Sequence, residues 1–374
     1  MRKCLFPLII LLAAVSCKEV RYQPRPTIPL VQVIAADSTG AGRLAAMAGK
    51  AGGSIAIIGE PESAVTLARR FQGCDRVDNV DGKPVRDSLP DYAGETFDVI
   101  MDAFRAPYSR FWTSAESLAD TLRHTVLDSL REVAVLNAMC AWDSLSWRST
   151  ADTEPLLRKE RAKLLIYLSP LQAQWGLFDV DTLQQMTGGK CLTVSPVKTM
   201  LEDAYASGAR SLAVWTSREV RNSGVWPFVF AAMDYPDAYL SVITPDAALD
   251  VRTELRSVLR QYLGTGRVLD ALLVDSFTID FVPLFTELAL IRSGVSAEDK
   301  AFQAILSPDF RVLDPSASVM DATYRLLRKH HLFTHQIALP AVHYYETAES
   351  VEGTPLLVET SDVYAISTYV SNLH

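Results

Sequence analysis

The sequence predicts an α/β fold with two lobes, each built on a doubly wound parallel sheet. Short apolar runs rich in β-branched residues alternate along the chain with helical patterns. Runs that are apolar at nearly every position are typical of parallel strands, because helices cover both faces of such a sheet. The length of 374 residues allows two domains, each large enough to bury its own core.

The first half of the chain contains five runs that we expect to form strands. Each is short, apolar and separated from the next by a longer segment, which fits strands joined by right-handed helical crossovers. A segment with helical character, at about residues 112–162, stands between the third run and the fourth. The five runs are Leu30–Ala36, Ser54–Gly59, Phe97–Ala103, Lys163–Ser169 and Cys191–Ser195.

The second half contains four further runs with tighter spacing, which we also expect to form strands. The segments between them have helical periodicity, and two such helices are expected to end at Gly264 and Gly294. Apolar residues that share one helix face mark the first of these helices; they are Leu255, Val258, Leu259 and Leu263. The four strands are Ser211–Thr216, Tyr239–Thr244, Leu269–Asp275 and Phe310–Leu313.

These patterns divide the chain into segments. Residues 1–16 are expected to be a signal peptide and residues 17–28 a tether. Residues 29–195 are expected to form an N-terminal lobe with the helical insert, and residues 196–334 a C-terminal lobe. Residues 335–374 hold two β-like runs without a helix between them, which predicts a terminal hairpin or hinge strands.

Composition excludes several classes of protein. The formal charge is -8, with 36 Lys and Arg against 44 Asp and Glu, and no basic cluster offsets it, so nucleic-acid binding is not expected. Hydrophobic residues make up 49% of the chain and charged residues 21%, which excludes a disordered or fibrous protein. Cys74, Cys140 and Cys191 form no CxxC pair, so neither a disulfide scaffold nor a cysteine zinc site is expected.

The N-terminus has the features of an export signal. Arg2 and Lys3 precede the apolar run Leu5–Val15, which is too short to span a bilayer as a helix. Small residues then lead to Cys17, and this arrangement resembles the lipobox of bacterial lipoproteins. The resemblance implies acylation of Cys17 (palmitate among the acyl groups) and a lipid anchor at the periplasmic or outer-membrane face of the cell envelope. The alternative is an ordinary signal peptide with an incidental cysteine.

The order of elements over residues 197–294 resembles the second lobe of type I periplasmic-binding-protein-like domains, of the leucine/substrate-binding type. Helices there end in glycine before a strand such as Ser211–Thr216, and a Leu-rich helix precedes the strand Leu269–Asp275. The resemblance implies a type I periplasmic-binding-protein-like architecture. It also implies that a small polar solute, such as an amino acid, is held between two lobes that close about a hinge.

Candidate ligand-binding residues follow from the rule that ligands of open α/β sheets bind beyond the carboxyl ends of the strands. Hydroxyl groups and helix N–H groups there could hold a carboxylate, and an aspartate could hold an amine. The alternative is that these residues only cap the helix that follows. The ligand-binding residues we expect are Ser38, Thr39, Asp102, Ser169, Trp215, Thr216, Asp275 and Ser276; Asp37, Glu60, Ser195, Ser217 and Thr278 have similar positions.

Other motifs give weaker signals, and we expect no cofactor and no metal ion. Gly40–Ala45 fits a dinucleotide fingerprint, but Asp37, Ser38 and Thr39 lengthen a turn that should be tight, so a small-residue turn into a helix is favoured. The histidines of the HHxxxH segment at 330–335 lack the glutamate of zinc proteases and fit the basic end of a helix. No G-x-S-x-G nucleophile elbow is present, and no catalytic residue is expected.

The expected function is therefore a non-catalytic, envelope-anchored lipoprotein that binds a small solute between two lobes. It could belong to an envelope transport or sensing complex. One alternative is an α/β enzyme of the envelope, either a hydrolase or an enzyme that uses a nucleotide or dinucleotide. Turnover in a substrate screen, or a titratable pair in the cleft with strongly shifted pKa values, would favour that alternative. Another is a structural component of an envelope complex that has lost its ligand.

The lipid anchor predicts the outcome of a fractionation experiment. Cys17→Ala should move the protein from the membrane fraction to the soluble fraction, because it removes the thiol that would carry the acyl chains. Detergent-free fractionation of cells that express the two forms measures this. A Cys17→Ala protein that stays in the membrane fraction would show that the lipobox interpretation is wrong.

Overall fold

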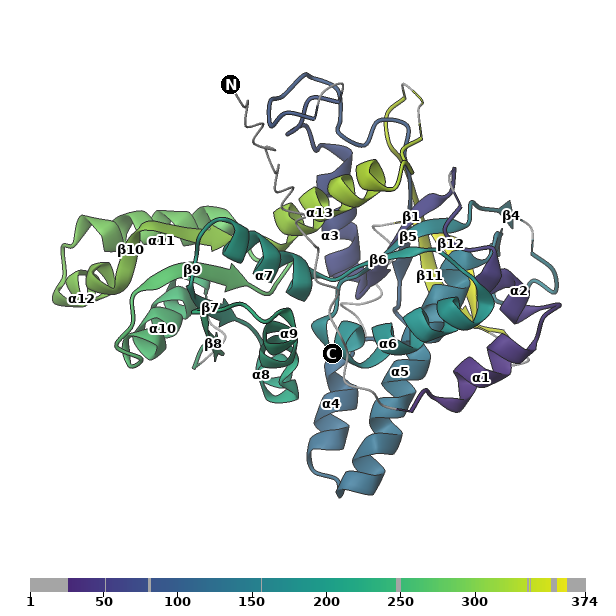
Figure 1. Ribbon diagram of the computed structural model, residues 1–374, viewed down its shortest axis with the longest axis horizontal. Helices are drawn as coiled ribbons and strands as arrows, with labels where there is room; N and C mark the ends of the chain where they lie inside the picture. The colour runs from purple at the N-terminus through teal and green to yellow at the C-terminus, as the bar shows by residue number, and fades with distance from the viewer. Residues whose placement is uncertain are drawn as a thin grey trace, which may run out of the picture.

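A computed structural model shows two α/β lobes side by side (Figure 1). The structure describes residues 26–50, 52–79, 82–155, 157–246, 250–334, 336, 338–350 and 355–361. Each lobe contains one main sheet, and the parallel strands predicted from the sequence form most of both sheets. The predicted α/β architecture with parallel-sheet lobes is thus confirmed.

The first lobe contains a six-stranded sheet with the order β12-β11-β2-β1-β5-β6. All neighbouring strands are parallel except β11 and β12, which form an antiparallel pair. The strands are β1 (Ser54–Gly59), β2 (Thr96–Met101), β5 (Ala162–Tyr167), β6 (Leu192–Val194), β11 (Ala341–Glu349) and β12 (Pro355–Thr360). A small separate sheet pairs β3 (Leu145–Ser146) with β4 (Leu157–Arg158).

The second lobe contains a four-stranded parallel sheet with the order β10-β9-β7-β8. Its strands are β7 (Ser211–Trp215), β8 (Tyr239–Ile243), β9 (Leu269–Val274) and β10 (Leu306–Leu313). In chain order, its four strands have the same spatial arrangement as β1, β2, β5 and β6 of the first lobe. In both lobes the second strand lies on one side of the first strand, and the third and fourth lie on the other. The place where the order reverses is therefore between β1 and β5 in one lobe and between β7 and β9 in the other.

The helices of the first lobe cover both faces of its sheet. The predicted helical insert at about 112–162 contains the 23-residue helix α5. Helices α1 and α2 precede the first strand, and α3 connects β1 to β2. The bounds are α1 (Pro29–Ala36), α2 (Ala41–Ala46), α3 (Pro61–Gln72), α4 (Ser109–Glu116), α5 (Asp120–Trp142) and α6 (Pro170–Thr187).

Two helices carry the chain from one lobe to the other. After β6 the helix α7 (Pro196–Ala206) packs in the core of the second lobe, and after β10 the helix α13 (Pro315–Lys329) packs in the core of the first (Figure 1). Both begin with proline at their first position, which suits helix initiation. The other helices of the second lobe are α8 (Arg218–Ser223), α9 (Val225–Met233), α10 (Val251–Leu263), α11 (Phe281–Ser293) and α12 (Ala297–Ile305).

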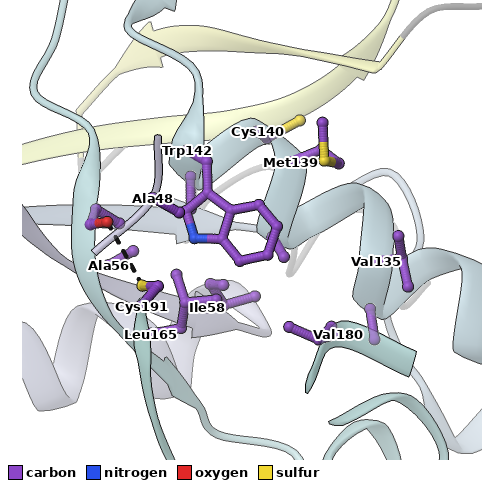
Figure 2. Close-up of a cluster of buried hydrophobic side chains, with 14 of the residues drawn as sticks. Ala48, Ala56, Ile58, Val135, Met139, Cys140, Trp142, Leu165, Val180 and Cys191 are labelled. Carbon is purple, nitrogen blue, oxygen red and sulfur yellow. Dashed lines mark hydrogen bonds between the residues drawn. The ribbon is translucent and has the colours of Figure 1, made fainter. Parts of the chain in front are cut away.

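Apolar side chains fill both faces of each sheet, as the continuous apolar strands predict. In the first lobe one face packs against α5 and α6, where the buried ring of Trp142 is surrounded by Ala48, Ile58 and Leu165 (Figure 2). The other face packs against α3 and α13. Burial of this kind supplies the main stabilising free energy of the fold.

One predicted strand is wrong, because Leu30–Ala36 lies in helix α1. Pro29 occupies the first turn, and the buried residues Val31 and Ile34 are three positions apart, so one helix face points into the core. A seven-residue apolar run does not distinguish a buried helix from a buried strand. The other eight predicted strands overlap β1, β2, β5, β6, β7, β8, β9 and β10.

Because residues 30–36 form a helix, the dinucleotide-binding alternative for Gly40–Ala45 is excluded. Gly40 follows helix α1 rather than a strand, so the strand-turn-helix unit that the fingerprint requires does not exist. A side chain at Gly42 would meet the carbonyl oxygens of Ile34 and Asp37, so close packing of α1 on α2 explains this glycine. His331 adopts a left-handed backbone after α13, and His335 lies outside the described residues.

The C-terminal part of the chain is tied to the first lobe by a buried ion pair. The Lys163 Nζ atom lies 2.6 Å from Glu95 Oε2, and both side chains are fully buried. Lys163 also donates to Leu332 O at 2.8 Å, and the N–H of Thr334 donates to Glu95 Oε1 at 2.6 Å. These contacts hold the segment between α13 and β11 against the amino ends of the strands.

We expect Glu95→Ala to lower the free energy of unfolding by about 3–5 kcal/mol, because it leaves the Lys163 charge buried without its partner. Chemical denaturation measures this loss. Adding Lys163→Met to Glu95→Ala should recover part of the loss, because the second change removes the orphaned charge. A loss below about 1 kcal/mol in the single variant would contradict a structural role for the pair.

Candidate functional site

The clearest candidate site is at the point in the second lobe where the strand order reverses. Thr216 follows β7 and Asp275 follows β9, so both residues border the crevice in which ligands of doubly wound sheets bind. The hydroxyl of Thr216 donates to Asp275 Oδ2 at 2.7 Å. The indole N–H of Trp226, on α9, donates to the same oxygen at 3.0 Å. Two strands and one helix thus hold this carboxyl group.

The surroundings of Asp275 favour a neutral carboxyl group. Burial raises the pKa of Asp275 to about 6, although the hydrogen bonds from Thr216 and Trp226 oppose the rise. Within the described part of the chain no cation pairs with this carboxylate. Both donors reach Oδ2, and no described donor reaches Oδ1. One oxygen is therefore anchored, and the other can exchange a proton.

Asp275 lies close to the boundary between the lobes. Two residues further on, the ring of Phe277 packs in the core of the first lobe. On the β7 side, helix α8 contacts two helices of the first lobe. Asn222 donates to Glu116 Oε1 of α4 at 2.7 Å, and Gln174 of α6 donates to Ser223 O at 3.5 Å. The strand ends that carry Thr216 and Asp275 therefore lie beside the first lobe.

The first lobe presents a second buried carboxylate at the end of β2. Asp102 accepts hydrogen bonds from Tyr108 at 2.8 Å, from Asn137 at 2.8 Å and from Thr347 at 2.5 Å. Arg105 Nη1 lies 3.7 Å from its Oδ1 atom. These partners come from the loop after β2, from α5 and from β11, so Asp102 ties three parts of the lobe together. Burial raises the pKa of Tyr108 well above its usual value, which keeps this donor neutral.

Polar atoms without a partner surround this network. Gln172, on the first turn of α6, is fully buried and lies beside Tyr108, whose pKa its side chain acts to lower; its amide meets no other hydrogen-bond partner in the described residues. Asn137 Oδ1 also meets no hydrogen-bond partner there. Buried polar groups are rarely left unsatisfied in native proteins. These atoms could therefore position a polar molecule at the edge of the first lobe.

Ser169 lies near the carboxyl end of the third strand of the first lobe, beside the reversal of strand order. Leu168 directly follows β5, as Asp275 follows β9, and Ser169 comes next, before the first turn of α6. Its side chain makes no capping hydrogen bond, although it is the N-cap residue of that helix. The cap alternative considered for Ser169 therefore has no support in the geometry.

The other predicted ligand-binding residues fall in different surroundings. Ser38 and Thr39 are exposed in the turn between α1 and α2, where Thr39 donates to Asp37 at 3.1 Å. Trp215 is 4% exposed and packs in the core of the second lobe. Ser276 is half-buried, and its hydroxyl lies 3.2 Å from that of Thr278. Ser217 caps α8, and Ser195 precedes α7 at the lobe crossing. Ligand contact by any of these residues remains a prediction.

Several residues of the site were not predicted from the sequence. Tyr108, Asn137 and Gln172 lie within helices or loops rather than directly after a strand. One signal was present, since Asn137 is a polar residue within the apolar run VAVLNAMCAW. A buried polar residue in such a run needs a partner, and here that partner is Asp102.

The described residues contain no group of three or more metal-ligating side chains. No described helix has the length and hydrophobicity needed to cross a membrane. Cys17 and the rest of residues 1–25 lie outside the described residues, so the export signal and the lipid anchor remain predictions.

Comparisons with known proteins place the fold beside racemases. No family model and no curated protein matches the chain. Among solved structures, a glutamate racemase from Francisella tularensis bound to D-glutamate matches with a TM-score of 0.49 and 12% identity, over 80% of this chain and 90% of that one. A glutamate racemase from Bacillus anthracis gives 0.49 and 12%, over 82% and 92%. An aspartate racemase homologue from Pyrococcus horikoshii gives 0.35 and 11%, over 74% and 99%.

These matches correct the family and the function expected from the sequence. The similar structures are racemases, not type I periplasmic-binding proteins, so the predicted resemblance was wrong. The expected non-catalytic solute-binding lipoprotein likewise finds no support, since the similar proteins are named as enzymes. The resemblance depended on the alternation of apolar strands with amphipathic helices along the chain. Any parallel α/β lobe shares this pattern.

The surroundings of Asp275 predict how its carboxyl group titrates. We expect its carboxyl carbon to titrate near pH 6 by NMR, with the signal assigned by Asp275→Asn. Thr216→Val should raise this pKa further, because it removes a donor that favours the charged form. Thr278→Val should leave it unchanged. Titration near pH 4 would show that the carboxyl group is solvated.

The raised pKa of Asp275 also makes the stability of the folded state depend on pH. The pKa of Asp275 in the folded state lies above its ordinary value of 3.8, so the folded state binds the proton more tightly than the unfolded state does. This carboxyl group therefore reduces stability as the pH rises from about 4 to 6, and the cost is constant above that interval. In Asp275→Asn this contribution to the pH dependence should be absent.

Proposed function

We propose that this chain is an enzyme that transfers a proton on a small polar molecule bound between the lobes, with Asp275 as the general acid–base group. The observation that carries the proposal is the geometry of Asp275 at the reversal point of the second sheet. The enzyme alternative considered above would be favoured by a titratable pair with strongly shifted pKa values in the cleft. Asp275 is one titratable group with a raised pKa at the lobe boundary.

The pKa of Asp275 suits proton transfer near neutral pH. General acid–base catalysis is most effective when the pKa of the catalytic group lies near the working pH. A value of about 6 leaves most of the carboxyl groups ionised at pH 7, while a substantial fraction of them still carries a proton at slightly lower pH. The group could therefore accept a proton and later return it.

The hydrogen bonds to Asp275 orient the carboxyl group for this role. Thr216 and Trp226 fix Oδ2, so the carboxyl plane is held while Oδ1 remains without a described donor. A capping residue would instead accept hydrogen bonds from the N–H groups of the next helix, as Asp280 does from Val282. Asp275 accepts from side chains only, which supports a role in the site rather than a cap.

The first lobe could supply the opposite wall of the site. Ser169 and the buried amide of Gln172 lie at the start of α6, next to the helices that contact the second lobe. Their polar atoms would bind and orient the substrate, while Asp275 performs the proton transfer. The similar racemase structures indicate a fold and do not identify a substrate of this chain. Their amino acid substrates are therefore included only among the compounds to be tested.

An exchange assay tests the proposal. The protein is incubated in D₂O with the D and L forms of glutamate, aspartate and other small amino acids and with 2-hydroxy and 2-oxo acids. Loss of the proton next to the carbonyl or carboxyl group is then followed by NMR. The wild-type protein should exchange the proton of at least one compound. Asp275→Asn should slow that exchange by about 100-fold or more, because it removes the proton acceptor.

Asp280→Asn is the matched control, since it makes the same change five residues away at an exposed helix cap. Asparagine also caps helices, so this variant should keep the wild-type rate. An Asp275→Asn protein that retains half of the wild-type rate would contradict the proposal. So would a wild-type protein that exchanges no compound in the panel.

A further inference from the structure

An apolar cavity in the first lobe is formed by elements that do not carry Asp275. Helices α1, α2 and α5 line it together with the segment at β3 and the start of β12. Its volume is about 250 Å³. Side chains from all these elements reach it, among them Ile34, Leu44, Met139, Trp147 and Leu357. Figure 2 shows Met139 and Cys140 on the side of α5 next to the C-terminal strands.

The lining of this cavity favours a hydrocarbon over water. Most of the surface that it presents is apolar, so a hydrocarbon enters it without the desolvation cost that a polar molecule would incur. Burial raises the pKa of Cys140 to about 12, so this lining thiol also stays neutral. An empty apolar space gives up the dispersion contacts that a fitting ligand would restore. An engineered cavity of about 150 Å³ accommodates benzene, so the present one has room for about ten carbon atoms.

One acidic residue, Asp143, is among the residues that line the cavity. Among its lining residues in the described chain, only Asp143 is ionisable to an anion near neutral pH. Asp143 is half-buried and accepts a hydrogen bond from the N–H of Leu145 at 3.2 Å. Arg105 and Lys159, the cations whose charges act on Cys140, already lie beside Asp102 at 3.7 Å and Asp98 at 3.4 Å. Both cations are therefore already paired, so the charge that can attract a ligand is the negative charge of Asp143.

We propose that this cavity binds a single hydrocarbon chain of about eight to ten carbons with a cationic head group, the tail lying among α1, α2 and α5 and the head beside Asp143. The apolar lining selects the tail, and the carboxylate selects the charge of the head. A fatty acid has the same tail, but its carboxylate would be repelled by Asp143. The charge of the head group therefore distinguishes this proposal from general affinity for lipids.

Decylamine and decanoate are matched probes, because they share tail length and differ in the charge of the head. Titration calorimetry below the micelle concentration of each compound measures binding to the full chain. Decylamine should bind the wild-type protein saturably with one molecule per chain, and more tightly than decanoate does. Asp143→Asn should weaken decylamine binding by about threefold and narrow the difference between the two probes. Equal binding of both probes to the wild-type protein would overturn the assignment of the head group.

Two tryptophan substitutions on α2 locate the bound tail. Ala41→Trp fills the cavity from its lining and should weaken decylamine binding by about tenfold or more. Ala46→Trp adds the same side chain on the exposed face of α2 and should leave the affinity unchanged. Trp147→Phe keeps the cavity apolar and should abolish the change in tryptophan fluorescence that decylamine causes. Undiminished binding to a folded Ala41→Trp protein, or an undiminished fluorescence change in Trp147→Phe, would overturn the proposal.

Discussion

The arrangement of the site depends on the meeting of parallel strand ends at the reversal of strand order. In each lobe the first strand lies between the second and the third, so the chain leaves neighbouring strands in opposite directions and a crevice forms between them. The backbone there must pass from strand to helix, which brings polar residues into a partly buried place. Thr216 and Asp275 occupy this place in the second lobe. Helix α7 follows the first sheet but packs in the core of the second lobe, and α13 follows the second sheet but packs in the core of the first. These two connections hold the two sheet edges together.

The carboxylates of the buried Asp102 and the half-buried Asp275 are stabilised differently, and this difference indicates different roles. Asp102 accepts three hydrogen bonds through both oxygens and lies beside Arg105, so its charge is well compensated. Asp275 has two neutral donors on one oxygen and no described cation, and its pKa rises to about 6. A fully bonded carboxylate holds elements in place, whereas one that is only partly stabilised can take up and release a proton.

Hydrophobic patterning predicted much of the fold, and the rule on strand ends predicted part of the site. Eight strands were found because each is a short, mostly apolar run between turns, whereas Leu30–Ala36 was too short to reveal its helical period. The rule on strand ends identified Asp275 and Thr216. Trp226 and Asn137 escaped it because tertiary packing, not their place in the sequence, brings them to the carboxylates. The family expected from this patterning was wrong, because buried α/β lobes of different families share it.

The most direct test of the account is the pH–rate profile of the proton-exchange reaction, measured for the wild-type protein and for Thr216→Val. If Asp275 is the base, the rate should rise with pH through an inflection near 6, since only the ionised carboxylate accepts a proton. Thr216→Val should move that inflection to higher pH, because a donor to the charged form is lost. A profile without an inflection near pH 6, or one that Thr216→Val leaves in place, would contradict the assignment of Asp275 as the catalytic base.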